Sequence, residues 1–143
     1  MSGFIRMKIL RKIVFALETP VAAIVLILFG CTPEVKPVDI FPEDNCSNCR
    51  MAISDRSFAS EIITEQGEVL KFDDLGCFAS FRKKNAELKI RASFVTDYET
   101  KQWLPYEKSV IVATGIETPM GSGKAAFSDS LKARIYEVKY PLP

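Results

Sequence analysis

Two thiols and a thioether lie within six residues, in the segment Cys46-Ser47-Asn48-Cys49-Arg50-Met51. A CxxC loop can bring both sulfurs to one point, and thiolate and thioether ligands together select soft monovalent copper over harder ions. The pattern for covalent haem attachment fails, because Arg50 stands where a histidine is required. The alternative is a disulfide or a thioredoxin-type redox pair made by Cys46 and Cys49. A redox CxxC usually opens a helix, whereas here a strand pattern follows.

The rest of the chain offers few other groups for chemistry. The sequence contains four cysteines, four methionines and no histidine, which excludes an imidazole base or an imidazole metal ligand. A structural zinc site needs four ligands, and only Cys77 remains in the domain, where we expect it to be a small buried core residue. No nucleophile, base and oxyanion hole can be assembled, so we predict that the protein is not an enzyme.

The N-terminal segment has the layout of a secretory signal. Four basic residues between Arg6 and Lys12 precede an apolar run, Val21–Phe29, which is too short to span a membrane. Leu28-Phe29-Gly30-Cys31 resembles the bacterial lipobox, which predicts lipidation of Cys31 and an extracytoplasmic, membrane-anchored protein. The alternative is an uncleaved anchor with an incidental cysteine. Thr32, in place of Asp, points to the outer membrane by the enterobacterial sorting pattern.

Composition and charge divide the chain into three parts. We predict a signal peptide over residues 1–30, a tether over residues 31–44 and a folded domain over residues 45–143. The tether is predicted to be extended, because residues 32–44 hold three prolines and four acidic groups without periodicity. The 113 residues after the signal carry a net charge of −2 and can still bury a modest core. Without a basic excess, there is no electrostatic case for nucleic-acid binding.

The first half of the domain predicts a ββαβ unit. Two β-prone runs, 57–64 and 68–72, are joined by a turn at Gln66-Gly67. Asp73-Asp74 is a typical helix N-cap, and the helix is expected to run to about Leu88. The alternating segment 90–97 then predicts another strand.

The second half repeats this pattern more weakly. Residues 110–113 form a buried-strand run, and Thr118–Gly123 is predicted to be a loop. Phe127, Leu131, Ile135 and Val138 then follow at the spacing of one helix face. The segment 135–140 also alternates, so a closing strand is the alternative to the helix. The fold class is therefore α+β.

Met120 is unusual because it lies in a Pro/Gly loop, whereas methionine normally fills a core. We predict that Met120 lies beside the CxxCxM loop and contributes a thioether to the same ion. Packing in the core is the alternative.

Taken together, these segments resemble the NosL family, the lipoprotein accessory factors of nitrous-oxide reductase. The resemblance covers roughly residues 45–130, and its landmarks occur in the family order. They are the lipobox at Cys31, Cys46-x-x-Cys49-x-Met51, Phe72-Asp73-Asp74-Leu75-Gly76-Cys77-Phe78, Val95-Thr96-Asp97-Tyr98, Trp103, and Thr118-Pro119-Met120-Gly121-Ser122-Gly123 followed by Ala126-Phe127.

The resemblance implies one compact domain of two ββαβ-like halves that binds copper(I) and hands it to a copper enzyme outside the cytoplasm. The implied partners are nitrous-oxide reductase apoprotein and its ABC-transporter assembly machinery. Cys46, Cys49 and Met51 match the metal-binding motif of the family, and Met120 matches its TPMG methionine. The chain departs from the family at Ser47 and Arg50, where relatives more often have proline and glycine.

Overall fold

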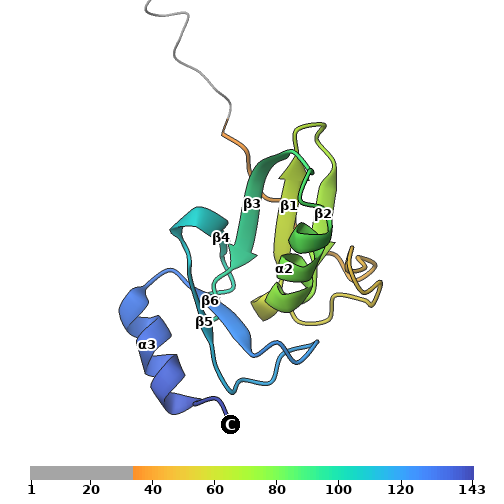
Figure 1. Ribbon diagram of the computed structural model, residues 1–143. Helices are drawn as coiled ribbons and strands as arrows, with labels where there is room; N and C mark the ends of the chain where they lie inside the picture. The colour runs from red at the N-terminus through yellow and green to blue at the C-terminus, as the bar shows by residue number, and fades with distance from the viewer. Residues whose placement is uncertain (1–33) are drawn as a thin grey trace, which may run out of the picture. The chain divides into compact units, whose positions relative to one another are not determined.

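The computed structural model describes residues 34–143 (Figure 1). The predicted signal peptide and the predicted lipidation site, Cys31, lie outside the described residues. Within residues 34–143, no helix is both long enough and apolar enough to cross a membrane. The domain is a mixed α+β fold with antiparallel sheets and two α-helices in the described part, so the predicted fold class is confirmed.

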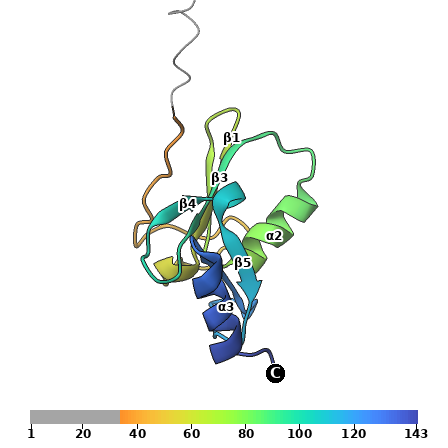
Figure 2. The same ribbon diagram turned by 90° about the vertical axis from the view of Figure 1, so that its left-hand side faces the viewer.

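A four-stranded antiparallel sheet forms the first half of the domain. Its strands are β1 (Ser60–Thr64), β2 (Val69–Phe72), β3 (Ile90–Thr96) and β4 (Trp103–Pro105), in the order β2-β1-β3-β4. Helix α2 (Leu75–Lys84) follows β2 and packs beside the sheet (Figures 1 and 2). The rings of Phe72 and Phe78 meet edge to face, with centroids 5.7 Å apart. This contact fixes the start of α2 against the end of β2.

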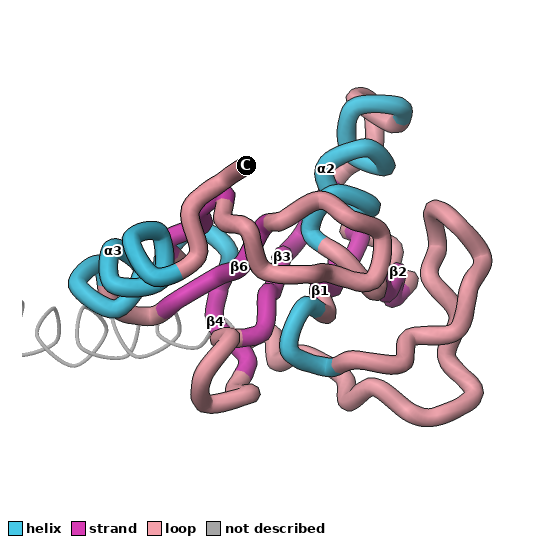
Figure 3. The backbone as a smooth tube through the Cα atoms, turned by 90° about the horizontal axis from the view of Figure 1, so that it is seen from below, coloured by secondary structure: helices cyan, strands magenta, loops and turns pink. Residues whose placement is uncertain are grey.

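A two-stranded antiparallel sheet and one helix form the second half. The strands are β5 (Val110–Ala113) and β6 (Lys124–Phe127), and α3 (Ser130–Lys139) packs against them (Figure 3). A parallel bridge between Asp97 and Ala126 links this unit to the end of β3. Short 3₁₀ turns at Arg56–Phe58 and Tyr106–Lys108 precede β1 and β5.

The predicted elements agree with this structure except at some boundaries. The first strand begins at Ser60, because the Asp55 carboxylate accepts a hydrogen bond from Ser57 N (2.8 Å) and starts the 3₁₀ turn instead. Helix α2 ends at Lys84, four residues before the predicted end, where the Asn85 side-chain amide donates to Phe81 O (2.9 Å).

The second half differs more from the prediction. Phe127 belongs to β6, a strand that the sequence pattern did not indicate, and the helix begins only at Ser130 and runs to Lys139. No closing strand follows α3 within residues 34–143, so the described order is ββα rather than ββαβ.

The predicted tether takes part in packing before residue 45. Ile40 is buried in the first core cluster. Both carboxylate oxygens of the buried Glu61 accept the backbone N–H of Val38, at 3.1 and 3.2 Å. Lys71 pairs with Asp44 at 2.6 Å. The packed domain therefore extends toward the N-terminus to about Val38.

Candidate metal centre

The segment Cys46–Met51 is a closed loop. Cys46 N donates to Met51 O (2.8 Å), and Arg50 N donates to Cys46 O (2.9 Å). Arg50 adopts a left-handed backbone with φ of 69°, a conformation that glycine adopts without strain. This explains why a glycine suits the position that Arg50 occupies. Ser47 N donates to Lys71 O (2.7 Å), which attaches the loop to β2.

The junction between β2 and α2 brings a second set of donors to the loop. Asp74 is the N-cap of α2, as predicted, and its Oδ1 accepts from Gly76 N at 2.5 Å. Asp73 directly follows β2 and precedes the N-cap, and Cys77 lies in the first turn of α2. Both are buried, with 2% and 5% exposure.

Four side chains converge where the loop meets this helix. One possible ligand atom from each of Cys46, Cys49, Asp73 and Cys77 lies within 4.8 Å of the others. The Cys49 thiol donates to the Asp73 carboxylate, with sulfur–oxygen distances of 3.6 and 3.7 Å. Two metal–sulfur bonds of about 2.3 Å can span at most about 4.6 Å, so a single ion could join these groups after only a small movement.

Burial decides the protonation of the thiols. It raises the pKa of Cys46, and the hydrogen bond with Asp73 raises it further. Burial also raises the pKa of Cys77 strongly. These two thiols are therefore protonated in the metal-free protein near neutral pH. Because a coordinating thiol loses its proton, metal binding at this site must release protons.

The two predicted methionine ligands are exposed. Met51, at the end of the loop, is 56% exposed, and Met120 is 43% exposed. A core-filling role for Met120 is thus excluded by its exposure. Whether either thioether binds an ion stays a prediction.

The loop that carries Met120 packs against the start of α2. Asp74 Oδ2 accepts from Thr118 Oγ1 (2.6 Å) and from Met120 N (3.2 Å). A side chain at Gly76 would bring its Cβ within 2.6 Å of Ser122 Cβ, so this glycine permits the close approach. Burial raises the pKa of Asp74, but hydrogen bonds from Ser122 and Thr118 outweigh it and keep the pKa below its usual range. The structure therefore brings Met120 to the helix that bears Cys77.

Asp73 and Cys77 are the candidate ligands that sequence reasoning missed. The sequence favours a helix cap for Asp73 and a buried core position for Cys77. Their positions directly after a predicted strand, four residues apart, are nevertheless a usable signal. The expectation of too few ligands for zinc is wrong, because three thiols and a carboxylate are four donors. The soft thiol set accommodates zinc as well as copper(I).

Comparisons with known proteins identify the family and the fold. The NosL family model matches residues 37–140. The crystal structure of the copper chaperone NosL from Shewanella denitrificans superposes with a TM-score of 0.66 and 19% sequence identity, covering 76% of this chain and 90% of that one. No curated protein matches the chain. Because the family model spans most of the sequence, the chain belongs to the NosL family.

Proposed function

We propose that this protein carries copper(I) as cargo, bound by Cys46, Cys49 and Cys77. The convergence of three thiols and Asp73 within 4.8 Å is the observation that supports this proposal most directly. Thiolates and nearby thioethers are the donors that copper(I) prefers. The family membership and the printed description of the Shewanella protein as a copper chaperone point to the same ion.

The gradient of burial across the site favours transfer of the ion over storage. Cys46 and Cys77 are buried, Cys49 is partly buried, and Met51 is exposed. An incoming ligand therefore reaches Met51 and Cys49 first, and ligand exchange can proceed from the surface inward. The Asp73 carboxylate accepts a hydrogen bond from the Cys49 thiol, so it is placed to assist the loss of the thiol proton when the ion binds.

The family resemblance supports a specific setting for this transfer. We propose that Cys31 is lipidated and that the domain is held on the periplasmic side of a membrane, the outer one by the residue after Cys31. The recipients would be nitrous-oxide reductase apoprotein and the ABC-transporter machinery that assembles it. In this role the protein is a carrier and not an enzyme.

The test is a titration of the reduced protein with copper(I) against a competing chelator, and separately with zinc(II). We expect copper(I) to bind tightly to the parent, and Cys49→Ser to weaken it strongly. Asp55→Asn is a control, because Asp55 caps a 3₁₀ turn outside the cysteine cluster. Tighter binding of zinc than of copper(I) at equal competition would contradict the copper proposal.

Three further variants separate a carrier from a thiol–disulfide oxidoreductase, the alternative that uses Cys46 and Cys49. In a carrier, Met51→Ala weakens copper(I) binding and leaves any disulfide exchange unchanged. If Met51→Ala and Cys77→Ser keep full copper affinity while Cys46→Ser abolishes a measurable disulfide exchange, the oxidoreductase function is correct and the carrier is not.

A further inference from the structure

Helix α3 presents an apolar stripe to solvent. Leu131, Ile135 and Val138 are 67%, 52% and 78% exposed, and their spacing of four and three residues puts them on one side of the helix. On the opposite side, Ala133 and Tyr136 pack against the second core cluster. The exposed side borders a shallow groove of about 390 Å³, lined by Leu131, Arg134, Ile135, Val138 and Lys139. A contiguous exposed stripe of this kind marks an interaction surface.

The charges beside the stripe are mainly basic. Arg134 and Lys139 line the groove, and Glu137 is the one acidic residue of α3. Lys132 is paired with Glu99 at 2.5 Å, so its positive charge is balanced within the domain. The Lys139 ammonium lies 5.2 Å from the ring centroid of Tyr140, at the end of the helix. An apolar stripe flanked by basic side chains is typical of helices that lie in a membrane interface.

A second copy of the chain is a poor occupant of this surface. A two-fold pairing of α3 with itself would bring Arg134 and Lys139 close to the same basic groups of the other copy. A helix of ten residues is also small beside the roughly 800 Å² per partner that stable protein interfaces bury. An anionic phospholipid surface can bury the apolar stripe among its acyl chains and pair the basic flanks with its headgroups.

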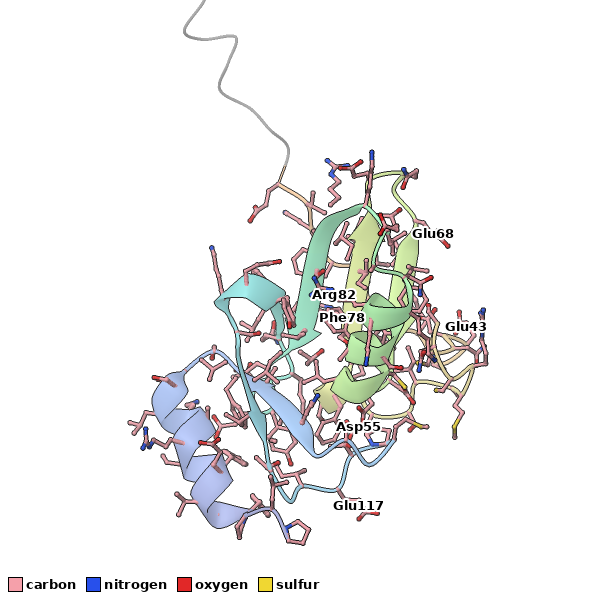
Figure 4. The ribbon with its side chains drawn as sticks, viewed as in Figure 1. Glu43, Asp55, Glu68, Phe78, Arg82 and Glu117 are labelled. Carbon is pink, nitrogen blue, oxygen red and sulfur yellow. The ribbon has the colours of Figure 1, made fainter. Side chains whose placement is uncertain are left out.

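The position of α3 is compatible with this contact. Figure 4 shows Glu43, three residues before Cys46, on the flank of the domain opposite α3, and Figure 1 shows the same separation between α3 and the loop around residue 45. A bilayer in contact with α3 therefore leaves the cysteine-bearing loop directed toward solvent and accessible to a recipient.

We propose that α3 is an interfacial helix whose Leu131–Ile135–Val138 stripe rests in an anionic phospholipid bilayer, with Arg134 and Lys139 at the headgroups. The proposal rests on the membrane anchor in the proposed function, which holds the domain near lipid, but it does not require copper binding. Helices of this type bury their apolar side to a depth of about 5–10 Å.

Fluorescence quenching by bromine-labelled acyl chains tests the contact. The full chain, isolated from membranes, is reconstituted in vesicles of phosphatidylcholine with or without phosphatidylglycerol. Trp103 is the one tryptophan of the chain, so Trp103→Phe gives a silent background. Val138→Trp is then compared with Lys83→Trp, which places the probe at an exposed position of α2. Both substituted side chains are exposed, so folding should be unaffected.

We expect Val138→Trp emission to shift to the blue and to lose intensity in the phosphatidylglycerol vesicles, whereas Lys83→Trp emission stays unchanged. Adding Arg134→Glu and Lys139→Glu should reverse most of this loss. Equal quenching of the two probes, or no quenching of Val138→Trp, overturns the proposal. A blue shift without quenching also overturns it, because a second copy or another protein then covers the stripe.

Vesicle flotation tests the lipid anchor separately from the lipid contact of α3. A chain that floats with the vesicles but leaves Val138→Trp unquenched keeps the anchor and disproves the lipid contact of α3. A chain that does not float with the vesicles contradicts both. Copper(I) titration of the same samples reports on the metal site independently.

Discussion

Helices α2 and α3 have the same length and opposite surroundings. Helix α2 buries Leu75, Cys77 and Phe78 against a four-stranded sheet, whereas α3 buries only Ala133. The sheet beside α3 has two strands, so it covers a smaller part of the helix surface. An apolar stripe at helical spacing therefore identifies a helix but does not say which side of it faces the core. The first half of the domain buries a polar, thiol-rich site, and the second half exposes an apolar surface.

The contrast between the buried side of α2 and the exposed stripe of α3 should have its largest effect on the free energy of unfolding. Phe78→Ala in α2 should lower the free energy of unfolding by about 3–5 kcal/mol, because it leaves a cavity beside Phe72. Ile135→Ala in α3 should change it by less than about 0.5 kcal/mol, because Ile135 is half exposed. Denaturant unfolding of both variants measures the difference. Similar losses would mean that the stripe of α3 is covered in solution.

The second effect concerns two buried carboxylates with opposite pKa shifts. Burial raises the pKa of Glu61 to about 7, against the opposing effects of the Val38 N–H and of Lys71. Burial raises the pKa of Asp97 too, but hydrogen bonds from Thr100 and Ser128 outweigh it and bring the pKa to about 2.

The signs of the pH dependence follow from these shifts. Because the folded state binds the Glu61 proton more tightly, its contribution to stability is greatest below about pH 4.5 and is lost as the pH rises to about 7. Asp97 stabilises the fold above about pH 4 and loses this effect toward pH 2. Glu61→Gln should therefore stabilise the protein at pH 8 by up to about 3 kcal/mol and by much less at pH 4. Thermal unfolding at both pH values checks this, and an equal gain at both would contradict the assignment.

The third effect is on metal binding in the first half. Cys77→Ser should weaken copper(I) binding by about 100-fold or more, since losing a ligand should exceed the tenfold losses that follow removal of supporting groups. Chelator competition measures the affinity of the reduced protein. Unchanged affinity would mean that Cys77 is a buried core residue and not a copper ligand.

The smallest effect tests whether the second half contributes to the metal site. Met120→Ala should weaken copper(I) binding about tenfold, with little change in the thermal midpoint of the metal-free protein, because the side chain is exposed. The same titration and a melting curve give both values. A large loss of stability with unchanged affinity would make Met120 a structural residue only.

Much of the fold could be predicted because local chemistry decides it. Runs of β-prone residues specified β1 and β2, alternation specified β3, Gln66-Gly67 specified the hairpin turn, and Asp74 specified the start of α2. Element ends were less predictable. Asn85 ends α2 by a side-chain hydrogen bond, and Asp55 diverts the chain before β1, so in both places one polar contact overrides the apolar pattern.

The sequence by itself determined the soft donor set, the absence of imidazole and the order of the family landmarks. Only the tertiary structure decided that Asp73 and Cys77 join Cys46 and Cys49, because the hydrogen bond from Ser47 N to Lys71 O attaches the loop to the end of β2, directly before Asp73 and α2. It also decided that the residues near Val38 belong to the domain and that the stripe of α3 is exposed. The physical reason is that donor type is a property of single residues, whereas proximity and burial depend on which distant segments pack together.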